Sequence, residues 1–412
     1  MKEYDLVVIG GGPAGLMAAG VAAEKGANVL VIEKNEILGK KLLMTGGGRC
    51  NLTNAEFDTR IFLNKFGKNR DALFSPMTVF GVKDTINYFN KIGLETKIEA
   101  NQRVFPTSDN SEDVLEVLFE NANKNGVEFM TSTVVSEIIG KDKKIEGVKV
   151  NGKILIAKNY VLATGGKSHP ETGSTGDGFI WLKKLGHTIT EPEPSLVPIT
   201  VSDKWVPELS GINLDLAGIS IWRNGEMIVK KKGKVLFTHF GLSGPGILNN
   251  SKIISGEMKK GEVEVKLDLF PGIGLDKLTI DFQNLINGNL NKLIKNVVWD
   301  KIPTKLLQTI FVLAYVDGTK QMNSLTHEEK NIVIKLLKSL SVKVTGLLGF
   351  DKAIISSGGV DVNEVDFKTM RSKLYINLFL IGDILDFDRP SGGYSLQLCW
   401  TTGYVAGINA IK

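Results

Sequence analysis

Short, fully apolar runs alternate with stretches of helical spacing in the first and last parts of the chain. An apolar run of about four to eight residues bounded by turn residues predicts a strand buried on both faces, as in a parallel sheet. The predicted strands cover residues 6–9, 28–32, 126–130, 160–166 and 374–381. The predicted helices cover residues 83–92, 111–125 and 396–410, besides an Ala-rich run that begins near residue 13. This alternation of strands and helices predicts an α/β fold.

The pattern changes in the middle of the chain. Residues 195–268 have short alternating strands and glycine turns, among them Asn224-Gly225, which is a strong hairpin signal. Helical spacing returns in residues 275–340, including 290–297, and a strand is expected again at 341–346. The predicted domains are a discontinuous α/β domain of residues 1–194 and 350–412, a β-rich domain of 195–270 and 341–349, and a helical domain of 271–340.

The strongest motif follows the first strand. Gly10, Gly12 and Gly15 form a G-x-G-x-x-G turn between the apolar run and the Ala-rich helix. The first glycine permits a tight turn, the second lets a pyrophosphate approach the backbone, and the third lets helix and strand pack closely. The helix N-terminus offers free N–H groups to the phosphates. Glu33 ends the second strand, where an acidic residue binds a ribose diol. These features predict a dinucleotide, and by themselves they fit NAD and FAD equally.

The C-terminal segment favours FAD. The last predicted strand ends in Gly382-Asp383, and a carboxylate there can accept hydrogen bonds from a ribityl chain, which NAD lacks. The Gly392-Gly393 turn aims a helix N-terminus at the same crevice, where its dipole favours the negative charge of a reduced flavin. The glycine-rich segment 45–51 is interpreted as a loop whose backbone meets a ligand, with a flexible surface loop as the alternative.

Only one complete dinucleotide fingerprint is present. Gly272 and Gly274 follow Pro271 but lack the third glycine, so no dedicated NAD(P)H domain is predicted. The enzyme would then either oxidise its substrate and pass electrons to oxygen, or take electrons from NAD(P)H that binds transiently.

Composition excludes several other classes. The net charge is +5, but Lys and acidic residues are interspersed, which argues against a dedicated nucleic-acid surface. The run 230–232 of three lysines is interpreted as a solvated hairpin turn. The two cysteines, Cys50 and Cys399, form neither a disulfide framework nor a metal-ligand pattern, so no metal site is expected. Without a signal peptide or an apolar run of about 18 residues, we expect a cytoplasmic protein with no membrane span.

Several longer strings resemble one family. They lie at residues 46–51, 104–109, 163–167, 172–178, 237–245 and 392–397. In this order, over nearly the whole chain, they are similar to the BaiN/YhiN-like FAD-dependent flavoproteins, which include an aminoacetone oxidase and a 3-dehydro-bile-acid reductase. The resemblance implies a glutathione-reductase-like FAD-binding Rossmann domain, an inserted β-barrel-like domain and a helical domain nested within it. Two positions differ from the family pattern: Asp383 stands where Glu is frequent, and His169 stands where an aromatic residue is expected.

The motifs and the resemblance together define a candidate cofactor site, with the loop 45–51 and the turn 391–398 against the flavin. The residues expected to bind FAD are Gly10, Gly12, Pro13, Ala14, Gly15, Glu33, Lys34, Lys41, Thr45, Gly46, Gly48, Arg49, Cys50, Asn51, Val134, Thr164, Gly165, Gly382, Asp383, Gly393, Tyr394, Ser395 and Leu396.

No catalytic acid or base stands out from the sequence. The candidates are His169, which follows a glycine-rich strand end, His239 in the string 237–241, and Cys50 in the predicted flavin loop, and each has a structural role as its alternative. Arg49 could face the pyrophosphate or a substrate anion.

The expected function is that of an FAD-dependent oxidoreductase that transfers a hydride between the flavin ring and a small organic substrate. It would work as an NAD(P)H-dependent reductase or as an oxygen-using oxidase. The alternatives are an RNA-associated or tRNA-modifying flavoprotein, with nucleic acid disfavoured by the dispersed charge, and a flavin-binding protein without turnover. The oligomeric state stays open.

Overall fold

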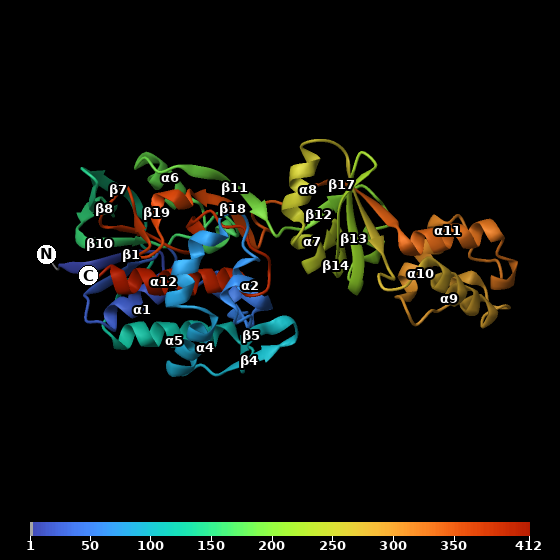
Figure 1. The fold of residues 1–412 in the computed structure, drawn as a ribbon, viewed down its shortest axis with the longest axis horizontal. Helices are drawn as coiled ribbons and strands as arrows, with labels where there is room; N and C mark the ends of the chain where they lie inside the picture. Colours follow the sequence, from blue (N-terminus) through green and yellow to red (C-terminus); the bar gives the residue numbers. More distant parts are fainter. Residues whose placement is uncertain (1–2) are drawn as a thin grey trace. The chain divides into compact units, whose positions relative to one another are not determined.

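The computed structural model describes residues 3–412, and the chain divides into two compact units (Figure 1). The first unit comprises the residues up to Pro194 together with Ala353–Lys412, and the second is Ser195–Lys352. This division keeps the predicted β-rich and helical segments in one unit. Their separation into two domains therefore stays a prediction.

The first unit is built on a seven-stranded sheet in the order β19-β20-β21-β10-β1-β2-β6. Its parallel strands are β1 (Tyr4–Ile9), β2 (Val29–Ile32), β6 (Glu128–Met130), β10 (Ala157–Leu162) and β21 (Leu378–Leu380). Two short antiparallel strands, β19 (Val365–Asp366) and β20 (Arg371–Ser372), complete one edge. The order, with β1 in the middle and crossovers on both sides, is that of a dinucleotide-binding Rossmann sheet, which confirms the predicted fold class.

The last predicted strand is shorter than expected. Residues 374–381 were predicted to be extended, but β21 covers only Leu378–Leu380. Asn377 lies just before it, buried, and its side-chain amide bonds the backbone of Ile145 at 2.7 and 2.9 Å and the carbonyl of Lys158. The apolar residues ahead of Asn377 therefore belong to a turn that this amide holds, not to the sheet.

Two helices from opposite ends of the sequence pack against each other beside this sheet (Figure 1). They are α1 (Pro13–Ala23), which is buried on every side, and α12 (Tyr394–Asn409). The contact needs glycine on α12: a Cβ at Gly403 would lie 2.6 Å from the carbonyl oxygen of Ala14, and one at Gly407 would lie 2.7 Å from that of Ala18. The backbones of the two helices therefore come closer than any larger residue would permit.

The rest of the first unit covers the sheet and connects its strands. Its helices are α2 (Thr59–Leu63), α3 (Phe74–Val79), α4 (Val82–Lys91), α5 (Ser111–Lys124) and α6 (Asp177–Lys184). Its other strands are β3 (Thr53–Asn54), β4 (Thr96–Glu99), β5 (Arg103–Pro106), β7 (Val135–Lys141), β8 (Lys144–Val150), β9 (Lys153–Leu155), β11 (Ile189–Ser195) and β18 (Ile355–Val360).

The second unit contains a closed barrel in the order β12-β15-β14-β13-β16-β17. The strands are β12 (Ile199–Val201), β13 (Asn213–Arg223), β14 (Glu226–Thr238), β15 (Gly241–Ser243), β16 (Val263–Asp268) and β17 (Leu340–Leu347). Alternate residues such as Ile219, Val265 and Val342 fill the interior. Two helices, α7 (Pro245–Leu248) and α8 (Ser251–Met258), belong to the same unit. The predicted β-barrel is confirmed.

Three helices lie between β16 and β17 in the sequence: α9 (Leu275–Asn287), α10 (Thr304–Leu313) and α11 (His327–Lys338). The helix predicted for 290–297 was wrong, because α9 ends at Asn287 with Gly288 as its C-cap, and only a 3₁₀ turn, Ile294–Asn296, precedes α10. The N–H of Ile294 bonds the carbonyl of Lys320 at 2.9 Å, and Leu293 forms a bridge with Gln321. These apolar residues are buried by extended pairing with a distant segment, which has no periodic signature in the sequence.

The three lysines at 230–232 do not form a turn, as was predicted. They lie inside β14, while the hairpin turn is Asn224-Gly225, with φ values of 49° and 84°. The hairpin turn forms at Asn224-Gly225 and not at the lysines, because both turn residues need the left-handed region, which Asn and Gly tolerate best.

A buried histidine in the first unit gives a prediction about pH. His187 places Nδ1 2.8 Å from a Glu364 oxygen and Nε2 3.0 Å from the Ser372 hydroxyl. Burial lowers the pKa of His187 below its ordinary value of 6.5, against the opposing effect of Glu364. The unfolded chain therefore binds the proton better, and stability falls as pH drops through about 6.5. Urea unfolding at several pH values should show this fall, and His187→Gln should flatten it. Equal slopes for the two proteins would contradict the assignment.

Candidate cofactor site

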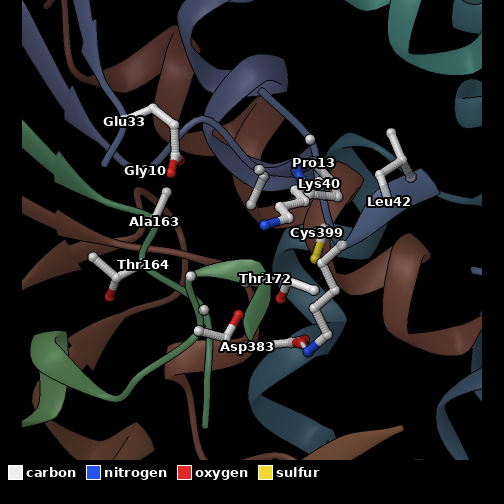
Figure 2. A pocket seen from close by; sticks show the side chains of 18 of the residues that line it. Gly10, Pro13, Glu33, Lys40, Leu42, Ala163, Thr164, Thr172, Asp383 and Cys399 are labelled. Carbon is white, nitrogen blue, oxygen red and sulfur yellow. Dashed lines mark ion pairs between the residues drawn. The ribbon is translucent and has the colours of Figure 1, made fainter. Parts of the chain in front are cut away.

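One deep cleft of the first unit opens at the carboxyl ends of its parallel strands. Residues from the ends of β1, β2, β10 and β21 line it, together with the N-termini of α1 and α12 (Figure 2). It encloses about 1210 Å³ of empty space, including the part open to solvent. The cleft lies where Rossmann folds bind their ligands.

The structure brings most of the predicted FAD-binding residues to this cleft. Those that line it are Gly10, Gly12, Pro13, Ala14, Glu33, Lys34, Lys41, Thr45, Val134, Thr164, Gly165, Gly382, Asp383, Ser395 and Leu396. Those that do not line it are Gly15, Gly46, Gly48, Arg49, Cys50, Asn51, Gly393 and Tyr394. Binding by any of these residues stays a prediction.

The three fingerprint glycines have different surroundings. Gly10 has a φ of 107°, and a Cβ there would lie 2.5 Å from the carbonyl oxygen of Ala163. A Cβ at Gly15 would lie 1.9 Å from the carbonyl oxygen of Gly10. Gly12, in contrast, has ordinary backbone angles and open space where a Cβ would stand. Gly10 and Gly15 are therefore required by packing, whereas Gly12 keeps the cleft clear above the backbone.

The N-terminus of α1 is free to receive an anion. Its N-cap is Gly12, which has no side chain to satisfy the first N–H groups of the helix. Pro13 has no N–H, and Ala14 and Gly15 donate none within the helix, because the first helical bond runs from Leu16 to Gly12. Two backbone donors and the positive end of the helix dipole thus lie beside the open space over Gly12.

Glu33 is fixed at the end of β2. One carboxylate oxygen accepts a hydrogen bond from the N–H of Gly11 at 2.8 Å. The other accepts from the N–H and the side-chain amide of Asn35, at 2.9 and 2.8 Å. Glu33 is 9% exposed and lines the cleft, so the carboxylate is presented to a ligand in a single orientation. This is the geometry that a ribose diol requires.

A charged cluster forms around Asp383, which lies on the opposite side of the view from Glu33 (Figure 2). The Asp383 carboxylate bonds the guanidinium of Arg389, whose side chain is 1% exposed. Arg389 also donates to the Ser395 hydroxyl at 2.9 Å and to the Phe387 carbonyl at 2.8 Å. The Lys41 ammonium lies 3.7 Å from Asp383 and donates to the Ser168 hydroxyl at 2.6 Å. Burial lowers the pKa of Lys41, and Asp383 opposes this shift.

Contacts with β3 and α4 and a hydrogen bond from Arg389 fix the N-terminus of α12. Its N-cap, Gly393, has a φ of 99°, and a Cβ there would lie 2.3 Å from the backbone of Thr53. Gln397 is fully buried and bonds the hydroxyls of Thr53 and Thr85. Ser395 is held by Arg389, so the first turn of α12 presents its N–H groups to the cleft at a fixed place.

The loop 45–51 is ordered but meets the cleft mainly through Thr45. Its first part is a 3₁₀ turn, Leu42–Gly47, that breaks at Thr45 and Gly46. The Arg49 guanidinium pairs with Glu99 and Asp109 and lies 4.1 Å from the centre of the Phe105 ring. Through these contacts, Arg49 links the loop to Glu99 of β4 and Phe105 of β5.

The two histidine candidates belong to different units. His169 has a φ of 53°, and its Nδ1 is 2.7 Å from a Glu171 oxygen. His239 belongs to the second unit, where it is exposed and its ring packs against Phe240. Neither histidine lines the cleft. Their roles in catalysis stay hypotheses.

The two cysteines should not react in the native protein. Burial raises the pKa of the Cys50 thiol to about 12, and burial likewise raises the pKa of Cys399. Because the thiolate is the nucleophile, we expect no rapid reaction with a disulfide reagent near neutral pH. Unfolding in guanidinium should release both thiols. One thiol that reacts at once in the folded protein would contradict this environment.

Several residues of the cleft were not predicted. They are Asn35, Lys40, Thr133, Ser174, Asp177, Trp181, Ile354 and Cys399. Asp177 begins α6 and bonds Lys34 at 2.8 Å. Asp177 belongs to the glycine-rich string 172–178, which carried part of the family resemblance. The glycines of this string were the signal that could have placed Asp177 in the site.

These features fit an FAD-like dinucleotide. The residues around Gly12 would receive the pyrophosphate, Glu33 the ribose, and Asp383 with the first turn of α12 the opposite end. Within residues 3–412 no cluster of three or more His, Cys, Asp or Glu side chains is placed to ligate a metal ion. Across the same residues no helix combines the length and apolar character that a membrane crossing requires.

Comparisons with known proteins match this description. The profile described as the HI0933-like protein Rossmann domain covers residues 4–409. A 3-dehydro-bile acid delta(4,6)-reductase from Clostridium scindens is 29% identical over 98% of both chains. A ribosomal RNA dihydrouridine synthase from Escherichia coli is 28% identical over 100% of this chain and 99% of its own, and one from Haemophilus influenzae is 29% identical over 99% of each.

A solved structure with the same fold is a 3-ketosteroid delta1-dehydrogenase from Sterolibacterium denitrificans. Its TM-score is 0.56 at 13% identity, with both chains fully covered. At this identity the likeness concerns the fold, which agrees with the sheet order and the inserted second unit.

Proposed function

This chain belongs to the HI0933-like Rossmann family, and from that premise we propose that it uses FAD to reduce a carbon–carbon double bond conjugated to a carbonyl group. The family assignment makes it an FAD-dependent oxidoreductase. The names of its full-length relatives carry the finer proposal. In a 3-dehydro-bile acid, the ketone is conjugated with the delta(4,6) double bonds. Dihydrouridine forms when the uracil double bond that is conjugated with a carbonyl group is reduced. The bond type is what the two reactions share.

The first unit would supply binding and orientation. The N–H groups of Ala14 and Gly15 hold the phosphates, and Glu33 holds the ribose at the other side of the Gly12 turn. Asp383, fixed by Arg389, orients the polyol end. When bound, FAD supplies the hydride that adds to the double bond, and a proton completes the addition.

The first turn of α12 and the two cations of the charged cluster favour negative charge at that end of the cleft. Lys41 and Arg389 share the single carboxylate of Asp383, so the group carries more positive than negative charge when Lys41 is protonated. An environment of this kind stabilises the reduced, anionic form of a flavin. It suits an enzyme that must hold electrons until a substrate arrives.

The reductant we propose is NADH or NADPH, bound transiently. Gly272 and Gly274 lie between a barrel strand and α9, and the third glycine of a fingerprint is missing there. A visiting nicotinamide does not need a domain of its own. This proposal leaves the oxygen-using oxidase as the competing direction.

A second candidate substrate is a uridine in ribosomal RNA. The relatives from Escherichia coli and Haemophilus influenzae match the chain from end to end, and their names specify this product. The chemistry at the double bond would be the same, and the difference would lie in how a large polyanion is held.

Anaerobic flavin absorbance tests the function. In protein loaded with FAD, the flavin absorbance should fall on mixing with NADH or NADPH. The absorbance should return when a 3-keto-4,6-diene steroid or a uridine-containing ribosomal RNA fragment is added. Return of colour with oxygen alone, together with bleaching by amines and not by nicotinamides, would overturn the reductase assignment in favour of an oxidase. Failure to bind FAD at all would overturn both.

A further inference from the structure

The positive charge of the protein belongs to the second unit. Residues 195–352 contain 21 Lys and Arg against 15 Asp and Glu, a net charge of +6. The whole chain has a net charge of +5, so the first unit stands at −1. The even spread of charge along the sequence therefore hides a separation between the two folded units. A basic second unit in a chain whose first unit is close to neutral indicates a partner with negative charge.

The lysines of the barrel gather on its outer surface. Strand pairing places Lys230 of β14 opposite Ser220 of β13, and Ser220 opposite Lys266 of β16. Directly paired residues share a face of the sheet, and so do residues two positions apart. Trp222 lies on the same face, because it pairs with Glu264. Glu264 pairs in turn with Lys343, which therefore shares this face as well.

The opposite face of these strands is the barrel core. Ile219, Ile221, Val265, Leu267 and Val342 occupy the intervening positions, and each is at most 1% exposed. The alternation therefore fixes Lys230, Lys232, Lys266 and Lys343 outside the barrel. We call Lys230, Lys232, Lys266, Lys343 and Trp222 the basic face.

The charges of the basic face are largely uncompensated. Lys230, Lys232 and Lys343 are exposed, and within residues 3–412 none of the three forms an ion pair. Asp268 is neutralised by Lys338, and Glu264 lies 3.7 Å from Lys266. Lysines without an ion-pair partner can exchange their counterions for phosphates at a small cost in free energy. The release of these counterions is how proteins gain affinity for nucleic acids.

Trp222 adds a flat aromatic surface among these cations. Its indole N–H donates to the Ser220 hydroxyl at 2.9 Å, and the Lys266 ammonium lies 4.0 Å from the ring centre. The ring is half-buried and held in one orientation. Lysines with an aromatic ring between them match a backbone of phosphates with bases that stack.

We propose that the basic face binds RNA. The inference rests on the second candidate under the proposed function, a uridine in ribosomal RNA, and assigns to the barrel the task of holding that polyanion. The lysines neutralise phosphates, and Trp222 stacks on an unpaired base. The binding is expected to weaken steeply with salt, as contacts between lysines and phosphates do.

Fluorescence anisotropy with a short uridine-containing RNA hairpin tests the proposal on the FAD-loaded protein. The variant K230Q/K232Q/K343Q should bind roughly tenfold more weakly at low salt, and the slope of log Kd against log salt should fall by about two, since each lost lysine contributes about 0.7–0.9. W222A should also bind roughly tenfold more weakly, while W222F keeps the affinity.

The matched control is K141Q/K143Q/K144Q, which removes three exposed lysines from the β7–β8 hairpin of the first unit. It should leave both Kd and slope unchanged. An equal loss in both triple variants, or no loss in the barrel variant, would overturn the assignment of the basic face, as would a wild-type protein that does not bind the hairpin.

Flavin bleaching by NAD(P)H in each variant keeps this test separate from the proposed function. If the flavin bleaches normally in all proteins and only the barrel variant loses RNA, the basic face is confirmed. If RNA binds through the basic face but its uridine is never reduced, uridine fails as the second candidate substrate while the surface assignment stands.

Discussion

The variant Gly12→Val is expected to fold normally and to lose FAD. A Cβ at this position would meet no protein atom within 4 Å, so we expect the fold to tolerate a small side chain. The same side chain would fill the approach to the N–H groups of Ala14 and Gly15 at the start of α1. Two hydrogen bonds to a charged phosphate, at about 1.5–3 kcal/mol each, would be lost, which raises the Kd for FAD by roughly 10²–10⁴-fold.

Equilibrium titration with FAD, followed by flavin fluorescence, measures this change. The control is Gly274→Val, because Gly274 is also the N-cap of a helix, has extended backbone and has open space around it. The control should bind FAD like the wild type, and far-ultraviolet circular dichroism should be the same for all three proteins. A Gly12→Val protein that retains its yellow colour through gel filtration would show that phosphates do not approach at Gly12.

The second large effect is expected at Arg389. Replacing it with methionine leaves the half-buried Asp383 carboxylate without its guanidinium, and it also frees Ser395 and the carbonyl of Phe387. Removing one partner of a buried ion pair costs about 3–5 kcal/mol. Because Asp383 is 15% exposed and keeps the Lys41 ammonium 3.7 Å away, urea unfolding should show a loss at or below the lower end of this range. FAD should bind more weakly because both Asp383 and the first turn of α12 lose their support.

A double-mutant cycle separates the lost charge from the lost packing. Asp383→Asn in the Arg389→Met background removes the stranded carboxylate, so the double variant should be more stable than Arg389→Met alone. Arg389→Lys should lie between wild type and Arg389→Met, because it keeps a charge but cannot reach three acceptors at once. If the two single losses simply add in the double variant, Arg389 acts by packing and not through Asp383.

The dinucleotide turn could be predicted because each of its requirements is local. The backbone of Gly10 and the contact at Gly15 demand glycine whatever the rest of the chain does, and Glu33 follows its strand at a fixed distance. The barrel hairpin was predictable for the same reason, since Asn224 and Gly225 carry the turn by themselves. The α/β fold class then followed from the alternation of strands and helices.

The parts that escaped prediction depend on contacts between distant segments. Arg389 does not stand out in a loop sequence, and its role exists only because Asp383, Phe387 and Ser395 converge on it. The extended course of 290–297 depends on pairing with 320–321, and the early end of the 374–381 run depends on the amide of Asn377. Apolar periodicity reports burial, but it does not report which backbone satisfies the buried groups.

The charge pattern shows the same limit. Counted along the chain, basic and acidic residues look evenly mixed, and the lysines at 230–232 look like a turn. Only the strand register brings Lys230 to the same face as Lys266, and only the division of the chain into units shows that the surplus charge belongs to one of them.

The close contact of α1 with α12 has a consequence for the order of folding during synthesis. Gly403 and Gly407 dock on a helix that is made before the second unit, and β21 completes the sheet only after the whole second unit has been made. At about 5–20 residues per second, the ribosome spends roughly 10–30 s on residues 195–352. The second unit is continuous and can fold in that interval, while the nascent first unit waits with an open sheet edge. Capture of the nucleotide would then follow the folding of the second unit.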